Sequence, residues 1–132
     1  AGLNTELKNK ALQTIADALV ANKEYIVSQN EEDLKKAKIL VEKGEITQSI
    51  YDRLKLSDAK FNDMIAGVLD VKKLQDPVNQ TLLATKLDEG LELYKVSCPI
   101  GVIGVIFEAR PDVVVQISSL AIKSFSSIAK FL

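Results

Sequence analysis

The sequence contains no histidine, no tryptophan and a single cysteine among its 132 residues. Without histidine the chain cannot form a Ser-His-Asp triad, a Cys-His pair or a zinc site with histidine ligands. The lone Cys98 excludes an internal disulfide and is typical of a protein kept in a reducing compartment. Aromatic residues make up only 5% of the chain, which leaves few side chains for stacking on nucleic-acid bases. Composition alone therefore excludes several classes of active site.

The chain also lacks an excess of one charge and any long apolar run. Lysine and arginine total 17 and the acidic residues 18, so no basic surface for nucleic acid or anionic lipid is indicated. The polar start AGLNTELKNK and the short apolar runs predict neither a signal peptide nor a membrane span. We expect a cytoplasmic protein of about one domain, with no nucleic-acid or membrane partner, and 47% hydrophobic residues to form its core.

Apolar residues recur at helical spacing through the region 1–76. Asn30 precedes three acidic residues, which predicts the N-cap of a second helix that ends at Gly44. A short helix is expected over 47–54, and Ser57 is expected to cap a longer one. The first helix is indicated by Leu3, Leu7, Leu12, Ile15, Ala16 and Leu19.

The pattern changes at Asp76-Pro77. Two strand-like runs, TLLATKL and LELYKVS, flank the turn residues Asp88-Glu89-Gly90. Such an arrangement predicts a β-hairpin, so we divide this part of the chain into a helical part, 1–76, and a hairpin, 77–98.

The region 99–124 reads as a strand, a short loop and a helix. The stretch from Ile100 to Phe107 has no polar side chain, which predicts a strand buried on both faces, as in parallel sheets. Gly101 and Gly104 serve either packing or the close approach of a ligand, although they do not form the dinucleotide-binding fingerprint. Pro111 is typical of a first helical residue.

The loop Glu108-Ala109-Arg110 is the strongest candidate site. A loop at the carboxyl end of a parallel strand, opening a helix, is where open α/β sheets bind ligands and where helix termini attract phosphate. From the residues alone two interpretations remain: Glu108 and Arg110 pair with each other, or they contact a ligand. Cys98 is interpreted as structural, because no histidine is present to activate it as a nucleophile.

The segment VSCPIGVIGVIFEARPDVVVQISSLAIKS resembles the γ-glutamyl phosphate reductase family of the aldehyde dehydrogenase superfamily. The pattern P-[IL]-G-V-x-x-x-I-[FY]-E-[AS]-R-P, here Pro99 to Pro111, is characteristic of that family. The motifs NEEDLKKAK, DRLKL and DPV extend the resemblance, which covers the chain from about residue 3 to Ser124. The same module forms the carboxyl-terminal half of bifunctional pyrroline-5-carboxylate synthases, so either parent is possible.

The resemblance implies an α/β fold: amino-terminal helices, a β-hairpin of the kind used for oligomer contacts, and the first strand-helix unit of an incomplete aldehyde-dehydrogenase-like Rossmann domain. It implies NADPH-dependent reduction of γ-glutamyl phosphate to glutamate 5-semialdehyde in proline biosynthesis, by an enzyme that forms homo-oligomers when full length. The cofactor-binding residues would be Ile106, Phe107, Glu108 and Ala109. Arg110 would bind the substrate anion, and no metal is implied.

The region 125–132 departs from the family, which continues with Gly-Asn and later Lys-Gly-Gly. We expect no second strand after the helix, and hence an amino-terminal fragment with a divergent tail. The family's catalytic cysteine would lie beyond it, so no catalytic residue is assigned here and the fragment alone should be inactive. Two alternatives remain: a non-catalytic subunit or interaction module that pairs with full-length reductase, and a helical domain of unrelated function.

Overall fold

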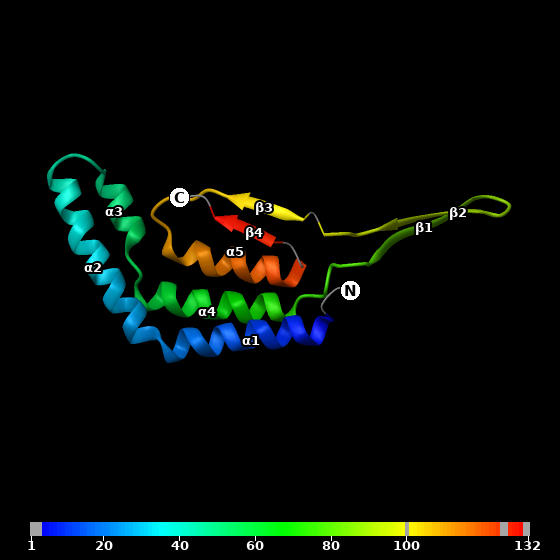
Figure 1. The fold of residues 1–132 in the computed structure, drawn as a ribbon, viewed down its shortest axis with the longest axis horizontal. Coiled ribbons are helices and arrows are strands. Elements are labelled where there is room, and N and C mark those ends of the chain that lie inside the picture. The colour runs from blue at the N-terminus through cyan, green and yellow to red at the C-terminus, as the bar shows by residue number, and fades with distance from the viewer. Residues whose placement is uncertain (1–3, 100, 125–126, 131–132) are drawn as a thin grey trace.

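The computed structural model describes residues 4–99, 101–124 and 127–130, and Figure 1 shows their arrangement. Leu3 and Ile100, which entered the predictions above, lie outside these ranges. The order of elements is α1 (Thr5–Ala21), α2 (Lys23–Glu42), α3 (Gln48–Leu54), α4 (Asp58–Lys73), β1 (Thr81–Asp88), β2 (Leu91–Val96), β3 (Val102–Val105), α5 (Pro111–Ser124) and β4 (Ser127–Lys130).

Three of the helices begin at a polar residue that accepts a hydrogen bond from the first turn. The side chain of Asn4 accepts from the Leu7 N–H at 2.8 Å, and Thr47 and Ser57 do the same for α3 and α4. Such caps satisfy backbone donors that have no partner inside the helix. The predicted short helix after Thr47 and the cap at Ser57 are confirmed.

The predicted N-cap at Asn30 is wrong, because α2 runs without interruption through this residue. Its side chain makes a tertiary contact instead. The Asn30 amide donates to the carbonyl of Leu54 at 2.9 Å, and its oxygen accepts from the N–H of Leu56 at 3.0 Å. An amide can cap a helix or bridge two chain segments with the same two groups, and the loop between α3 and α4 supplies partners for the second role.

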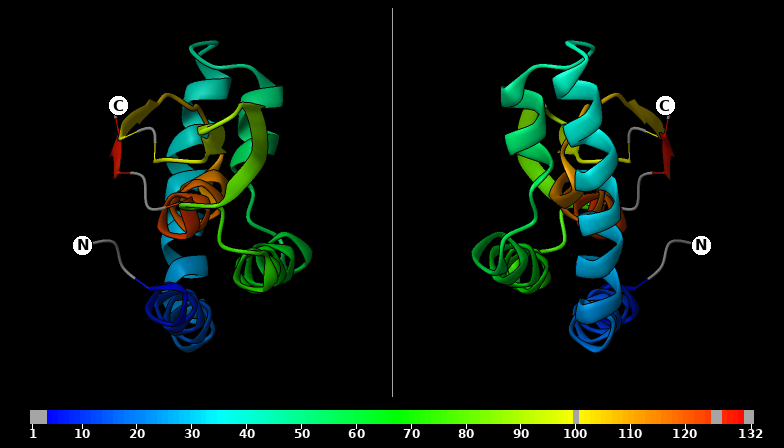
Figure 2. Two further views of the ribbon diagram at one scale, coloured as in Figure 1. Left: turned by 90° about the vertical axis from the view of Figure 1, so that its right-hand side faces the viewer. Right: turned by 90° about the vertical axis from the view of Figure 1, so that its left-hand side faces the viewer.

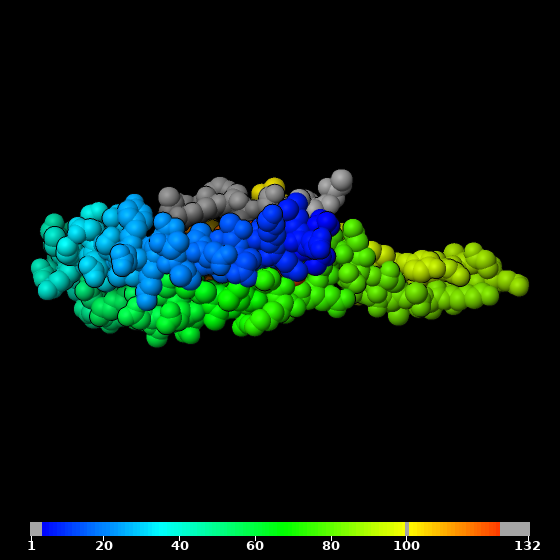
Figure 3. All heavy atoms as spheres, turned by 90° about the horizontal axis from the view of Figure 1, so that it is seen from below, coloured from blue at the N-terminus to red at the C-terminus, as the bar shows by residue number. Residues whose placement is uncertain are grey.

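The core lies where α1, α4 and α5 pack side by side. Figure 3 shows α1 and α4 together on one face. Figure 1 shows α2 and α3 at the end of the body opposite the hairpin, and the right-hand view of Figure 2 looks onto that end. The buried apolar side chains are Leu12, Ala16, Ala37, Leu56, Phe61, Met64, Val68 and Val113. The apolar periodicity predicted for this region is confirmed in α1 by burial of Leu12 and Ala16 and in α4 by burial of Phe61 and Val68. Leu7, which was expected on the same face of α1, is instead 48% exposed.

The hairpin of β1 and β2 projects from the helical body as a narrow arm (Figures 1 and 3). The strands are antiparallel, with Ala84 opposite Tyr94 and Thr85 opposite Leu93, and the turn contains Gly90 with φ of 78°. Every residue of both strands is exposed. The predicted hairpin is confirmed, and its apolar side chains have no helix or sheet covering them among the described residues.

The expectation that no second strand follows the helix is wrong. β4 pairs in parallel with β3, with Ile103 opposite Ile128, so β3, α5 and β4 form a complete βαβ unit. An edge strand presents unpaired N–H and C=O groups, and an extended segment that returns along it after α5 satisfies them. Because strands pair through backbone hydrogen bonds, this pairing does not require the residues that the reductase family has after the helix.

The predicted burial of β3 on both faces is also wrong in this chain. Its residues alternate between exposed and half-buried, and Val102 is 72% exposed. The cause is the layer arrangement: α5 lies on one side of the two-stranded sheet, and no described element covers the other (Figure 1). The predicted mixed α/β class, with helices, a hairpin and a strand-helix unit, is confirmed. No helix in the described ranges is long and apolar enough to cross a membrane.

Candidate functional site

The loop between β3 and α5 lies at the carboxyl edge of the parallel sheet. β3 and β4 run in the same direction, with Val105 opposite Lys130, so both strands end at this edge (Figure 1). α5 begins there at Pro111, and its amino terminus carries the positive end of the helix dipole. This is the geometry in which open α/β sheets bind ligands.

Ala109 gives the loop its shape. Its φ of 52° lies in the left-handed region, which costs a residue with a Cβ about 1 kcal/mol or more. The turn at Ala109 lets the chain leave the strand and enter α5 within a few residues, where the N–H of Val113 donates to the Arg110 carbonyl at 3.2 Å. The small alanine side chain leaves room for this reversal, so Glu108 and Arg110 stand on either side of a tight turn.

Arg110 makes its ion pair with Asp112 rather than with Glu108. The guanidinium Nη2 lies 3.4 Å from the Asp112 carboxylate, which also accepts from Gln116 at 3.3 Å. The Arg110 side chain is 53% exposed, so this long contact contributes little to stability. An incoming anion could therefore replace Asp112 at small cost, and the guanidinium could bind it through two parallel hydrogen bonds.

The proposed cofactor-contacting residues differ in exposure. Ile106 is 85% exposed and continues the open apolar face of β3 that Val102 begins. Phe107 and Ala109 are half-buried, whereas Glu108 is exposed. The loop thus offers an apolar strand end, one carboxylate and one guanidinium.

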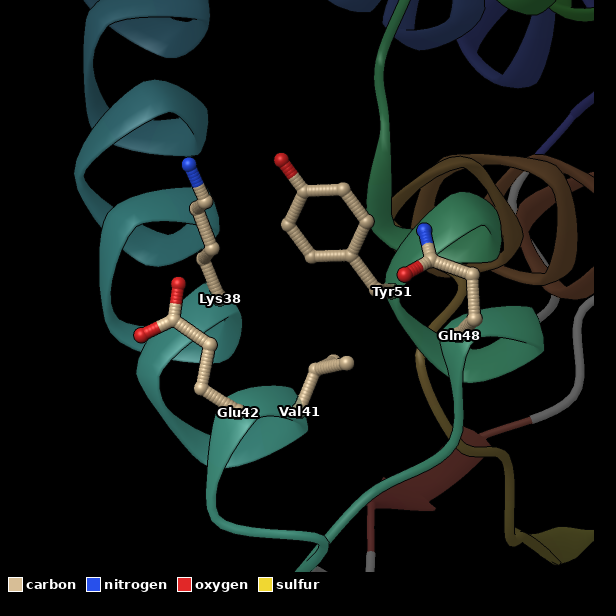
Figure 4. Close-up of a pocket in the computed structure, with 5 residues that line it drawn as sticks. All are labelled: Lys38, Val41, Glu42, Gln48 and Tyr51. Atoms are coloured by element: carbon tan, nitrogen blue, oxygen red, sulfur yellow. The ribbon is translucent and has the colours of Figure 1, made fainter.

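A separate surface pocket lies between α2 and α3 and has a volume of about 260 Å³ (Figure 4). Side chains from the two helices face each other across it, and each is exposed or half-buried. The lining residues are Lys38, Val41, Glu42, Gln48 and Tyr51. The pocket has no residue in common with the loop after β3, so it is not the site predicted from the sequence.

Two buried lysines are features that the sequence pattern did not indicate. Lys8 and Lys123 are 1% and 3% exposed, although lysines in amphipathic helices normally face solvent. They lie near the ends of α1 and α5 and take part in one hydrogen-bond network.

Cys98 is exposed and precedes Pro99 in the link between β2 and β3. Within the described ranges, no group of acidic or cysteine side chains could hold a metal ion.

The chain is similar in sequence to proteins named γ-glutamyl phosphate reductase. It is 51% identical to the one from Brachyspira hyodysenteriae over 126 residues, which is 96% of this chain and 29% of that protein. It is 54% identical to the one from Methanosarcina barkeri over 122 residues, or 92% of this chain and 27% of that protein. The chain therefore spans less than a third of the length of these curated relatives. No family model matches the chain.

Solved structures agree with the sequence comparison. The crystal structure of γ-glutamyl phosphate reductase from Saccharomyces cerevisiae superposes with a TM-score of 0.87 at 38% identity, covering 98% of this chain and 32% of that one. The enzyme from Thermotoga maritima gives a TM-score of 0.84 at 34% identity, covering 98% of this chain and 30% of that one. In sequence and in fold, the chain is similar to a segment that makes up less than a third of proteins named γ-glutamyl phosphate reductase.

Proposed function

We propose that the chain is part of an enzyme that reduces γ-glutamyl phosphate to glutamate 5-semialdehyde with NADPH, a reaction of proline biosynthesis in the cytoplasm. The observation that carries the proposal is sequence identity of about one half over nearly the whole chain to proteins that bear the reductase name. The shared fold with a solved reductase, at 38% identity, gives further support to the proposal.

The loop after β3 is the part of the chain that would take part in the reaction. Ile106, Phe107, Glu108 and Ala109 would form one wall of the nicotinamide site, and NADPH, when bound, supplies the hydride. Arg110 would hold the phosphate or the carboxylate of the substrate. The weak Arg110–Asp112 pair supports this role, because it keeps the guanidinium oriented at the sheet edge but leaves it able to exchange partners.

The acyl-accepting thiol is proposed to lie outside this chain. Cys98 is exposed on the link between β2 and β3, at the end of β3 opposite to the Arg110 loop. β3 starts four residues after Cys98 and ends five residues before Arg110, so the length of the strand separates the two side chains. A thiol must lie within bonding distance of the acyl carbon, and this separation is too great for a substrate anion held by Arg110.

A chimera tests the proposal. The homologous segment of the Brachyspira hyodysenteriae reductase would be replaced by this chain, and the purified protein assayed by oxidation of NADPH with γ-glutamyl phosphate. We expect turnover in the chimera and none from the chain alone. A folded chimera that binds neither NADPH nor substrate would contradict the proposal, and Cys98→Ala in an active chimera should leave its rate unchanged.

The alternative is an interaction module that pairs with full-length reductase. The observation in its favour is the exposed hairpin: Leu83 and Leu93 lie on one face at 50% and 48% exposure, and Tyr94 lies on the opposite face at 57%. Contiguous exposed apolar side chains are typical of surfaces that bind another protein. Size-exclusion chromatography of the chain mixed with a full-length reductase distinguishes the two proposals: a stable mixed complex with unchanged turnover would favour the module.

A further inference from the structure

A network of buried polar groups joins the ends of three helices. The Lys8 ammonium donates to the two carboxylate oxygens of Asp76, at 2.9 and 2.8 Å, and to the carbonyl of Lys123 at 3.2 Å. Lys8 is 1% exposed and the Asp76 side chain 12%. A charge this deeply buried is tolerated only when it is paired and hydrogen-bonded. The geometry around Lys8 is therefore strongly constrained.

Lys123 extends the network to α4. Its ammonium, 3% exposed, donates to the side-chain oxygen of Asn9 at 2.8 Å and to the carbonyl of Lys72 at 2.9 Å. Lys72 lies in the last turn of α4, and Lys123 in the last turn of α5. The Lys123 ammonium thus lies at the carboxyl end of α4, and the Lys8 ammonium lies at the carboxyl end of α5. Both are negative ends of a helix dipole. The ends of α1, α4 and α5 are fixed relative to one another.

Asp76 connects this hydrogen-bond network to the segment that precedes the hairpin. Its carboxylate accepts from the Thr5 hydroxyl at 2.9 Å and from the N–H of Val78 at 3.1 Å, in addition to Lys8. Burial of the carboxylate opposes ionisation, but the hydrogen bonds from Lys8, Val78 and Thr5 outweigh it and keep the pKa of Asp76 below its usual value. The ionised side chain holds the backbone that leads into β1.

Ser97 joins that segment to the other strand of the hairpin. The N–H of Gln80 donates to the Ser97 hydroxyl oxygen at 2.9 Å, and the N–H of Asn79 donates to the Ser97 carbonyl at 3.0 Å. The Ser97 hydroxyl in turn donates to the carbonyl of Pro77. Both strands of the hairpin are therefore tied at their base to the short segment that follows Asp76.

Among the described residues, the strands of the hairpin gain no support from packing against the helices. All residues of β1 and β2 are exposed, so no apolar face packs against the helices. An element with so little buried surface changes its angle freely unless its base is held. We propose that Asp76, bound by Lys8, fixes the angle between the hairpin and the helical body, so that the hairpin is a rigid arm. This inference does not depend on the proposed enzyme function.

Distance measurements between spin labels test the arm directly in this chain. In a Cys98→Ser background, labels would be attached through Ala18→Cys on α1 and Thr85→Cys on β1, which are exposed positions. We expect one narrow distance distribution. Asp76→Asn should broaden it roughly twofold or add a second component. The matched control is Asp70→Asn, since Asp70 pairs with Lys73 at 2.8 Å on the surface of α4, with both side chains about 70% exposed or more.

A role for Asp76 in stability alone predicts a different result. Asp76→Asn would then lower the melting temperature and leave the distance distribution of the folded protein narrow, and this outcome overturns the proposal. Should Asp76→Asn fail to fold by circular dichroism, Ser97→Ala serves in its place. It removes the side-chain hydrogen bonds at the base of the hairpin and touches no helix. An unchanged narrow distribution in a folded Ser97→Ala protein would equally contradict the rigid arm.

Discussion

Arg110 is the residue on which the proposed substrate contact depends most. It carries a half-exposed guanidinium at the carboxyl edge of the sheet, with a long contact of 3.4 Å to Asp112. Glu108 and Ala109, which precede Arg110, shape the loop but carry no positive charge. Substitution of Arg110 should therefore weaken anion binding without changing the fold of the loop.

In the chimeric reductase, Arg110→Met should lower kcat/KM for the acyl phosphate by about 10- to 100-fold, since a charge-assisted hydrogen bond contributes roughly 1.5–3 kcal/mol. Steady-state kinetics would measure it. Arg53→Met is the control, because Arg53 is the other arginine of the chain and lies exposed on α3, where it donates to the Ser49 carbonyl. Equal losses in both variants would show that Arg110 contributes only general charge.

Asp76 predicts a particular pH dependence of stability. Its pKa is lowered in the folded protein, so its contribution is fully present above the unfolded value near 4 and is lost as pH falls through the lower folded value. Asp76→Asn should cost about 2 kcal/mol or more near neutral pH, because Lys8 loses its buried counter-charge. Urea unfolding from pH 7 to pH 2.5 should show the difference between the two proteins shrinking below about pH 4.

The other carboxylates with lowered pKa values cancel in that comparison. The pKa values of Glu32, Asp52 and Asp58 are held down chiefly by hydrogen bonds from Lys35, Lys55 and Lys23, which both proteins share. A difference that stays constant down to pH 2.5 would show that Asp76 gains nothing from its buried ion pair.

At the scale of elements, the end of α2 depends on a glycine in the left-handed backbone conformation. Gly44 follows α2 with φ of 74°, its N–H donates to the Val41 carbonyl at 2.9 Å, and that of Glu45 donates to Leu40 at 2.9 Å. The prediction that Gly44 ends this helix is confirmed. Glycine at this place avoids the strain of a Cβ in the left-handed region.

Two glycine substitutions should therefore change stability in opposite directions. Gly44→Ala should destabilise by about 1 kcal/mol, because alanine is strained at positive φ. Gly67→Ala should stabilise by about 0.4–1 kcal/mol, because Gly67 lies inside α4 and a Cβ there meets no atom within 4 Å. Thermal unfolding followed by circular dichroism measures both. A loss of stability in Gly67→Ala would show that the site is less open than the structure indicates.

At the scale of the whole molecule, the hairpin and the helical body are energetically separate. The core residues belong to α1, α2, α4, α5 and the turn at Leu56, and none comes from β1 or β2. Among the described residues, the hairpin therefore adds no side chain to the buried core of the body.

Replacing residues 83–94 by an Asn-Gly turn should leave the melting temperature of the helical body within about 2 °C, because the removed side chains bury no area against it. Differential scanning calorimetry would measure it. Leu12→Ala, at a position with 0% exposure, shows the sensitivity of the experiment, since it should cost about 3–5 kcal/mol. A large drop on shortening the hairpin would mean that it packs on the body in solution.

Much of the fold could be predicted because its signals are local. The caps at Thr47 and Ser57, the end of α2 at Gly44 and the hairpin turn at Gly90 each depend on residues within a few positions along the chain. The site at the loop after β3 could be located in the same way, from an apolar run that meets two charges and a proline. The roles assigned to its residues remain predictions.

The amino-acid sequence by itself determined the alternation of helices, hairpin, strand and helix up to α5, the position of the loop from Ile106 to Arg110 and the resemblance to the reductases. Only the tertiary structure decided that Asn30 bridges two segments, that β4 pairs with β3 and that Lys8 and Lys123 are buried. Periodicity along a helix reports which residues share a face. It does not report which backbone carbonyls and carboxylates a distant element brings to that face, and such partners make burial of a lysine possible.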